Sequence, residues 1–185
     1  ETSYSTPQKV QKLKDEDGNL IDFPEVKAIA AGGDHTVFLH SDDTVSGVGY
    51  NYYGQLGLMT GGADLNTPMQ SPSLSSSYYV SNNPVKDIAA GYNHTLFLHN
   101  DGTLSVAGSN DKRQLGLGSG GVYASRRKIN RLSGVTSLMN TAYNINISLI
   151  RKDDSIYYSG ELSNIFLNGI GMNTSSSEVN GNTSV

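Results

Sequence analysis

One segment of the sequence returns further along the chain, and this repeat constrains the fold more than any other feature. Residues 26–58 align with residues 85–117 without a gap, a displacement of 59 positions. Both copies read Val-Lys-x-Ile-Ala-Ala-Gly-x-x-His-Thr and later Gly-x-Asn-x-x-x-Gln-Leu-Gly-Leu. A third, degraded copy starts near Val135. Self-similarity at a fixed period predicts stacked structural units, because each unit covers its apolar faces with a neighbour.

Each copy predicts short strands separated by turns. Residues 28–31 and 36–39 have the length of strands and are separated by Gly-Gly-Asp, and Ser-Asp-Asp separates the second from residues 44–48. Both faces of residues 36–39 are mostly apolar, as a sheet covered on both sides by other sheets requires. Leu56 and Leu58 are predicted to fill the gap between two sheets. We therefore predict an all-β fold, a partial β-propeller of about three four-stranded antiparallel blades.

The repeat also sets the expected segments of the chain. Residues 6–13 resemble residues 125–132, which indicates an outer strand before the first full copy. The stretch 60–84, rich in Ser, Asn and Pro, falls outside the repeat and is predicted to be loop or disordered. In chain order we predict an outer strand of a preceding blade and a linker at 1–25, a blade with a long insertion at 26–84, a second blade at 85–134, a degenerate third blade at 135–171 and a disordered tail at 172–185.

The composition excludes several classes of protein. The 185 residues include no cysteine, which excludes disulfides, thiolate zinc sites and a cysteine nucleophile. The formal net charge of −4 argues against a nucleic-acid partner, because phosphate contacts usually need a basic face. No run of about 18 apolar residues is present, so we expect no membrane span. The N-terminus also lacks the basic-then-apolar pattern of a secretory signal.

No pattern of residues predicts catalysis. His35 and His94 occupy one position of the repeat, and His40 and His99 occupy another, so we interpret all four as structural residues. A histidine after the glycine turn can bond to the backbone and hold its own hairpin. The glycine-rich stretch 118–121 is not followed by Gly-Lys-Ser/Thr, so no phosphate cradle is expected. We predict no enzyme activity, no cofactor and no metal site.

Two groups of residues are candidates for binding a protein partner. Tyrosines in loops are common contact residues at interfaces, because they offer a large area at a small entropic cost. A basic run between residues 112 and 131 contains no acid. It is either a surface for an anionic partner or a solvated outer strand that uses charge to avoid edge pairing. The candidates are Tyr50, Tyr52, Tyr53, Tyr78, Tyr79, Lys112, Arg113, Arg126, Arg127, Lys128 and Arg131.

The repeated pattern, with Asp-Gly-Thr-Leu between its two halves, resembles the repeat of the regulator of chromosome condensation family. The match is close over residues 85–118, nearly as close over 26–58 and loose over 135–171. The resemblance implies four-stranded blades, commonly seven, in a ring around a central channel. The sequence departs from the family pattern at Asp42-Asp43, which replaces Asp-Gly, and it lacks the tryptophan frequent in the following strand.

Three units cannot close a ring of about seven blades, because blades do not bury their flat faces alone. We therefore expect further blades from the same or another chain, or a partner that caps the open faces. The family includes a nucleotide-exchange factor for a small nuclear GTPase, segments of ubiquitin ligases, a plant photoreceptor and bacterial inhibitor proteins, so the resemblance does not choose a function. Our first hypothesis is a non-catalytic protein–protein interaction module or scaffold. The alternatives are a guanine-nucleotide exchange factor for a small GTPase and a structural subunit of a larger assembly.

Overall fold

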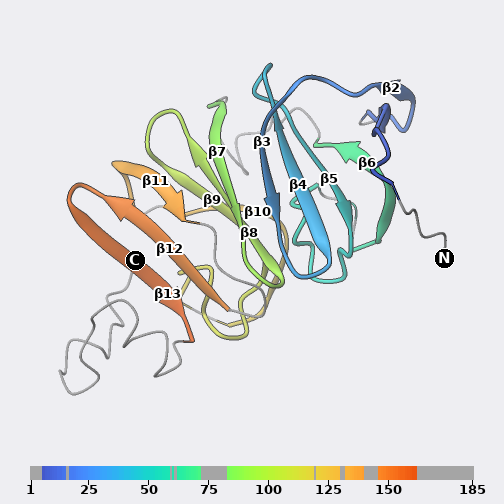
Figure 1. Cartoon of the computed structure of the whole chain (residues 1–185). Helices are drawn as coiled ribbons and strands as arrows, with labels where there is room; N and C mark the ends of the chain where they lie inside the picture. The colour runs from blue at the N-terminus through green and yellow to red at the C-terminus, as the bar shows by residue number, and fades with distance from the viewer. Residues whose placement is uncertain are drawn as a thin grey trace.

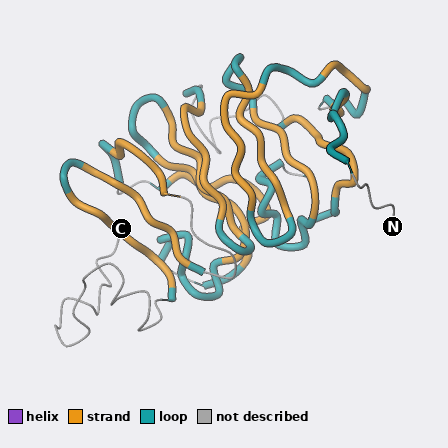
Figure 2. Tube along the Cα trace, viewed as in Figure 1, coloured by secondary structure: helices purple, strands orange, loops and turns teal. Residues whose placement is uncertain are grey.

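The chain folds into three β-sheets that stand side by side (Figure 1). The computed structural model describes residues 6–15, 17–58, 60, 62–71, 83–118, 120–129, 132–139 and 146–161. Within these ranges every regular element is a strand, and Figure 2 shows the strands joined by loops. A search of the same ranges for a helix that could span a membrane finds none. The prediction of an all-β, partial propeller is confirmed.

The first sheet contains the complete first copy of the repeat, which we call blade 1. Its strands are β3 (Val26–Ala31), β4 (His35–His40), β5 (Val45–Gly49) and β6 (Leu65–Gln70), each antiparallel to the next. In the register of this sheet Ile29 pairs with Phe38, and Phe38 pairs with Ser46. Adjacent side chains alternate between the two faces, so β4 directs Val37 and Leu39 to one face and Phe38 to the other.

The second sheet, blade 2, repeats this arrangement. Its strands are β7 (Val85–Ala90), β8 (His94–His99), β9 (Leu104–Ser109) and β10 (Val122–Lys128), again antiparallel in sequence order. Ile88 pairs with Phe97, and Phe97 pairs with Ser105. Each of these residues lies 59 positions after its counterpart in blade 1, so the sequence repeat and the structural repeat have the same register.

Blade 3 has three described strands, and the last of them ends at a glycine with the same backbone conformation as in blades 1 and 2. The strands are β11 (Val135–Met139), β12 (Ile147–Lys152) and β13 (Ser155–Gly160). Gly160 ends β13 with φ 118°, as Gly49 ends β5 with φ 104° and Gly108 lies in β9 with φ 111°. A Cβ atom on Gly160 would lie 2.0 Å from the carbonyl oxygen of Asn146. Only glycine meets both requirements.

Two segments differ from the sequence-based expectation. The stretch 60–84 was expected to be loop, but Leu65–Gln70 forms the outer strand β6. Residues 1–25 were expected to supply a strand of a preceding blade. Instead β1 (Lys12–Lys14) and β2 (Leu20–Asp22) form a hairpin, and β1 pairs with β6 in parallel through Lys14 and Met69. The outer edge of β6 offers unpaired backbone groups to such a strand. The expected tail at 172–185 lies outside the described residues.

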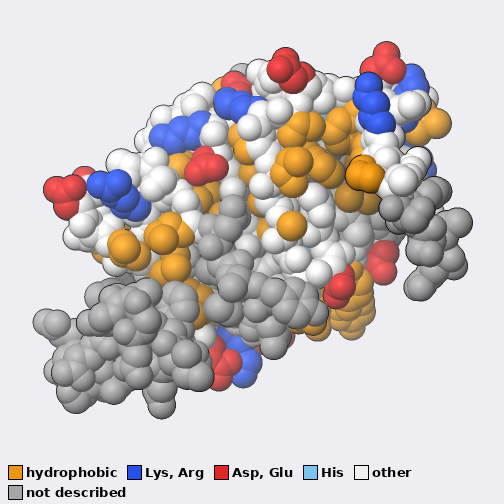
Figure 3. All heavy atoms as spheres, in the orientation of Figure 1, with side chains coloured by type: hydrophobic (Ala, Val, Ile, Leu, Met, Phe, Trp, Pro, Cys, Tyr) orange, Lys and Arg blue, Asp and Glu red, His pale blue; other side chains and the backbone are white. Residues whose placement is uncertain are grey.

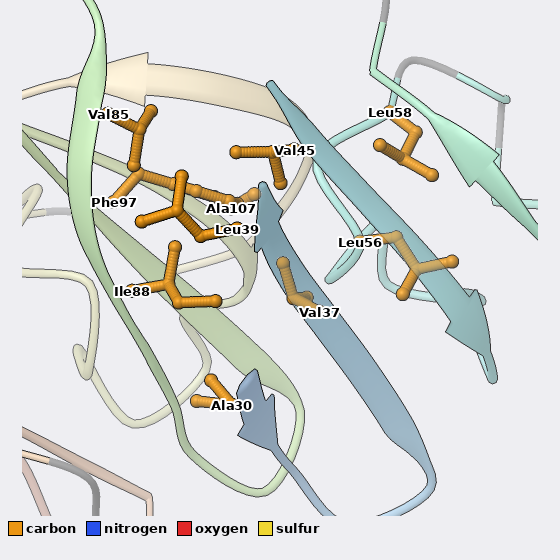
Figure 4. Packing of buried hydrophobic residues seen from close by; sticks show 11 residues of the cluster. Ala30, Val37, Leu39, Val45, Leu56, Leu58, Val85, Ile88, Phe97 and Ala107 are labelled. Carbon is orange, nitrogen blue, oxygen red and sulfur yellow. The ribbon is translucent and has the colours of Figure 1, made fainter. Parts of the chain in front are cut away.

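The core lies between the sheets. Val37 and Leu39 of β4 pack against Ile88 and Phe97 of blade 2 (Figure 4). Leu56 and Leu58, which follow β5, are buried in the same cluster, as their alternation with glycine predicts. A second cluster joins blades 2 and 3, and it contains Leu96, Leu98, Leu104, Leu115, Val135 and Ile150. Each fully buried side chain of this size contributes about 1.5–3 kcal/mol.

The outward face of blade 1 is exposed, whereas the equivalent face of blade 2 packs against blade 1. Ile29 is 58% exposed, whereas its counterpart Ile88 is 3% exposed under blade 1. Phe38 is half-buried, with the ring of Phe23 against it edge-on at a centroid distance of 5.2 Å. Figure 3 shows hydrophobic side chains gathered at the surface in the region of β3 and β4. Blade 1 therefore presents an open blade face.

Candidate functional site

The turn after the third strand is held in the same way in blades 1 and 2. In blade 1, Asn51 Oδ1 accepts a hydrogen bond from the backbone N–H of Leu56 at 3.0 Å. Gln55 Oε1 accepts one from the N–H of Tyr53 at 3.1 Å. The equivalent bonds in blade 2 join Asn110 Oδ1 to the N–H of Leu115 at 2.7 Å and Gln114 Oε1 to the N–H of Lys112 at 2.9 Å. The shared asparagine and glutamine are therefore buried braces of the turn.

The side chains around the shared asparagine and glutamine differ between the two blades. We call residues 50–58 and 109–117 the third-strand turns; both lie at the lower edge of the molecule in Figure 1. Tyr50, Tyr52 and Tyr53 of blade 1 align with Ser109, Asp111 and Lys112 of blade 2. The shared backbone of the turns thus carries unlike surfaces. The tyrosines and the basic pair Lys112 and Arg113, which the sequence singles out separately, lie on equivalent turns of neighbouring blades.

The three tyrosine rings of blade 1 form one cluster. The rings of Tyr50 and Tyr52 are nearly parallel, with 13° between their planes and 6.3 Å between their centroids. The ring of Tyr53 is nearly perpendicular to both, at 6.1 Å from Tyr50 and 5.1 Å from Tyr52. Tyr52 is 67% exposed. Burial and the proximity of Tyr53 raise the pKa of Tyr50, and the carboxylates of Asp64 and Asp34 contribute to the rise, so its hydroxyl stays protonated.

The turn of blade 2 is charged and contains an unfavourable backbone conformation. Lys112 Nζ lies 3.1 Å from Glu161 Oε2, and both side chains are exposed. Arg113 has φ 61° at the position where Gly54 of blade 1 has φ 72°. A side chain in this left-handed region costs about 1–2 kcal/mol relative to glycine. Arg113 therefore occupies a position at which the fold itself favours glycine.

Arg126, which the sequence places among the surface candidates, is an interior residue. It is 4% exposed, and its guanidinium carbon lies 4.4 Å from the centroid of the Phe97 ring. It donates from Nε to the carbonyl oxygen of Gly57 at 3.3 Å and from Nη2 to Ser71 Oγ. Burial lowers the pKa of Arg126 to about 10, so the group remains charged at neutral pH. Its side chain joins blades 1 and 2 and is not available to a partner.

The remaining basic candidates lie on the outer strand of blade 2. Arg127 and Lys128 are half-buried residues of β10. The guanidinium carbon of Arg127 lies 6.0 Å from the centroid of the Tyr123 ring. The structure thus separates these two residues from the turn that carries Lys112 and Arg113. Three further candidates fall outside the described residues: Tyr78, Tyr79 and Arg131.

The histidines make hydrogen bonds that differ from those expected from the sequence. His35 Nε2 lies 3.0 Å from Thr95 Oγ1 of the next blade, and His94 Nε2 lies 3.0 Å from Ser148 Oγ of the blade after that. These histidines join blades rather than bonding to the backbone of their own hairpins. The hydroxyls share one repeat position, and this is the signal in the sequence that the interpretation missed. Burial lowers the pKa of His35 to about 4.

The other two histidines act within a sheet. His40 Nε2 lies 2.7 Å from Ser46 Oγ, and His99 Nε2 lies 2.8 Å from Ser105 Oγ, in each case on the adjacent strand. Among the described residues no group of three or more His, Cys, Asp or Glu side chains could hold a metal ion. The exposed side chains of the third-strand turns offer aromatic rings and charged groups.

Comparison with known proteins agrees with this architecture. The model of the regulator of chromosome condensation (RCC1) repeat matches residues 26–55 and 85–114, and a second model of the same repeat matches residues 42–98. Protein RCC1 of Candida albicans is 30% identical over 128 residues, which cover 68% of this chain and 27% of that protein. The X-linked retinitis pigmentosa GTPase regulator of Homo sapiens is 31% identical over 116 residues, which cover 63% of this chain and 10% of that protein.

Solved structures show the same fold at lower identity. Yeast RCC1 (Prp20), in a crystal structure with Kap60, has a TM-score of 0.61 and 24% identity, and human WBSCR16 has a TM-score of 0.61 and 18% identity. Each match covers 77% of this chain, but only 34% and 35% of the solved chains. The chain thus spans about a third of those structures and about a quarter or less of the curated relatives.

The stacked sheets and the braced turns define a segment of a repeat-built β-propeller. The chain contains repeats of the regulator of chromosome condensation (RCC1) type, which the family models match between residues 26 and 114.

Proposed function

We propose that the chain is a non-catalytic protein interaction module and that its third-strand turns carry the binding surface. The observation behind this proposal is the contrast within those turns. The buried braces are the same in blades 1 and 2, whereas the exposed Tyr52 and the half-buried Tyr53 are replaced by the exposed Asp111 and Lys112. Side chains that the fold does not require are free to carry specificity.

Arg113 supports the proposal independently. The fold would be more stable with glycine at this position, because the backbone has φ 61°. The arginine side chain is exposed, and the hydrogen bonds that hold the described turn use the backbone of Arg113 and not its side chain. Residues that lower stability without a structural gain are often functional.

The experiment is site-specific photo-crosslinking with the full chain. A crosslinking amino acid replaces Tyr52 in one variant and Arg113 in a second, and both are incubated with an extract of the cells that express the protein. A matched control carries it at Ser41, an exposed residue in the turn between β4 and β5 at the opposite end of blade 1.

The proposal expects a discrete crosslinked protein from position 52 or 113 and none from position 41. Unlabelled wild-type chain should compete for the product, and a Tyr52→Ala/Arg113→Gly chain should compete at least several-fold less well. Crosslinking from position 41 alone, or equal competition by the two chains, would contradict a binding surface on the turns.

Regulation of a small GTPase is the second candidate function. A relative that is 31% identical over 116 residues is named a GTPase regulator, and another is Protein RCC1. If the chain promotes nucleotide exchange, it will accelerate the release of a fluorescent guanine nucleotide from a small GTPase in the presence of excess unlabelled nucleotide. An unchanged release rate at high concentrations of the chain would remove this candidate and leave the interaction module in place.

A further inference from the structure

The tyrosine cluster has the chemistry of a site for a positive charge. Tyr52 exposes most of its ring, and the rings of Tyr50 and Tyr53 lie against it. The face of an aromatic ring carries partial negative charge and attracts guanidinium and ammonium groups within about 6 Å of its centroid. Three contacting rings offer a larger and more rigid surface of this kind than one ring does.

Acidic residues next to the cluster add to its negative potential. Asp34 and Asp64 are exposed, and both contribute to the raised pKa of Tyr50, after burial and Tyr53. The ion pairs in the described part of the chain involve neither of these carboxylates. The cluster therefore combines aromatic faces with negative charges that no described ion pair neutralises.

The turn holds these groups in place without a ligand. Asp64 Oδ1 accepts a hydrogen bond from the backbone N–H of Asn51 at 2.7 Å, and Asn51 Nδ2 donates to Thr60 Oγ1 at 2.7 Å. These bonds fix the backbone before Tyr52, and the bond from the Tyr53 N–H to Gln55 Oε1 fixes the backbone after it, so little ordering is needed when a ligand binds. Preorganisation of this kind increases affinity because the entropic cost of binding is smaller.

We propose that the cluster Tyr50, Tyr52 and Tyr53, together with Asp34 and Asp64, binds an arginine side chain presented by a partner protein. The proposal rests on the proposed function and names the chemistry of the partner at blade 1. A guanidinium between two rings needs about 7 Å between their planes. The centroids of the nearly parallel rings of Tyr50 and Tyr52 are 6.3 Å apart, so the space between their planes is narrower than this requirement. The arginine therefore stacks on the exposed face of Tyr52 rather than between the rings.

The same turn in blade 2 lacks the features of this site. It carries Lys112 and Arg113 in place of aromatic residues, and its acid Asp111 is accompanied by these two cations. An arginine ligand should avoid this turn. The control variant is Ser41→Ala, changed at the opposite end of blade 1 from the cluster, and it should bind the ligand as well as the wild-type chain.

The probe is the blocked peptide acetyl-Gly-Arg-Gly-amide, titrated at millimolar concentration into the full chain while the tyrosine ring resonances are recorded by NMR. The citrulline version of the peptide has the same shape without the charge. The proposal expects the arginine peptide to shift the Tyr52 ring resonances and to bind about two- to five-fold more tightly than the citrulline peptide. Tyr52→Phe should retain this preference, Tyr52→Leu should lose it, and Asp34→Asn should reduce it.

Equal binding of the two peptides, or full binding by Tyr52→Leu, would overturn the proposal. A lysine peptide that binds as tightly as the arginine peptide would overturn the choice of arginine, because it would show that charge alone is recognised.

The outcomes of the peptide titration are independent of those of the crosslinking experiment. Crosslinking from position 52 without a preference for arginine would retain the proposed function and reject only this inference, whereas arginine binding without crosslinks from positions 52 and 113 would reject the proposed function.

Discussion

His35 Nε2 and Thr95 Oγ1 lie 3.0 Å apart, although the two residues are 60 positions apart in the sequence and belong to different blades. The same bond recurs one blade further on between His94 and Ser148, at 3.0 Å. Ser148 Oγ also donates to the carbonyl oxygen of Gln114 at 2.6 Å. Because a hydroxyl has one hydrogen, His94 must donate from Nε2, so its ring is the neutral Nε2–H tautomer. Blades 1 and 2 thus each bond to the following blade through one histidine that burial keeps uncharged.

Loss of one hydroxyl should therefore destabilise the contact between two blades. In Thr95→Val the buried Nε2 of His35 loses its partner, and we expect the free energy of unfolding to fall by about 1–3 kcal/mol. Thr95→Ser keeps the hydroxyl and should lose less. Urea denaturation followed by circular dichroism measures both. A Thr95→Val chain as stable as the wild type would show that the bond does not contribute.

The stability of the fold should decrease in mild acid. Burial lowers the pKa of both His35 and His94 to about 4, with the proximity of His35 adding to the effect on His94. In the unfolded chain their pKa returns to about 6.5. The unfolded state thus binds more protons between these values, and the free energy of unfolding falls as the pH drops from about 6.5 to 4.

The expected slope is up to about 1.4 kcal/mol per pH unit for each of these histidines. Urea denaturation at pH 7.5, 6.0 and 5.0 measures it. His35→Gln removes one of the two groups and should reduce the slope. Equal stability at pH 7.5 and 5.0, or an unchanged slope in the variant, would contradict the assignment of neutral buried histidines.

Arg113→Gly should stabilise the chain while it weakens partner binding. Glycine relieves the backbone strain at φ 61°, partly offset by its larger entropy in the unfolded state, so a gain of about 0.5–1 kcal/mol is expected. Gly54→Ala at the equivalent position of blade 1 should destabilise by about 1–2 kcal/mol for the same reason. Thermal unfolding of both variants tests the pair. A less stable Arg113→Gly chain would show that the arginine has a structural role.

The open face of blade 1 predicts unequal effects at two equivalent isoleucines. Ile88→Ala removes a side chain that is 3% exposed and should cost about 2–5 kcal/mol. Ile29→Ala removes one that is 58% exposed and should cost about 0.5 kcal/mol or less. Denaturant unfolding of the two variants compares them directly. A large loss in Ile29→Ala would mean that another molecule covers this face in solution.

The repeat made much of the fold predictable from the sequence. The glycine of Gly-x-x-His is one example, since a Cβ on Gly91 would lie 2.0 Å from Cε1 of His94 and a Cβ on Gly32 would lie 2.1 Å from Cε1 of His35. Two residues that recur together at this spacing indicate such a contact. The strands and their pairing follow from the same alignment, because residues at equal positions of a repeat occupy equal environments.

Features that occur only once were not predictable in this way. Arg126 has no arginine counterpart 59 positions earlier, where Thr67 stands, so the repeat did not indicate whether it is buried. Its interior position depends on the ring of Phe97 and on Ser71, which lies 55 residues away. The outer strand β6 contains Pro68, and a proline usually indicates a break in a strand except at the edge of a sheet.

The candidate site was predictable only as a group of unusual residues. The sequence identified Tyr50, Tyr52 and Tyr53 and, separately, Lys112 and Arg113. Their placement on equivalent turns depends on the buried braces, whose role is visible only in the hydrogen bonds of the structure.

The central claim is that shared residues maintain the fold and unshared turn residues bind. Its most direct test is a chain in which the turn of blade 1 carries the side chains of blade 2, made by Tyr50→Ser, Tyr52→Asp and Tyr53→Lys. Circular dichroism during urea denaturation and competition in the crosslinking assay would be measured on the same preparation. We predict a free energy of unfolding within about 1 kcal/mol of the wild-type value and a loss of competition for the partner crosslinked from position 52. A chain that unfolds, or one that competes as well as the wild type, would contradict the claim.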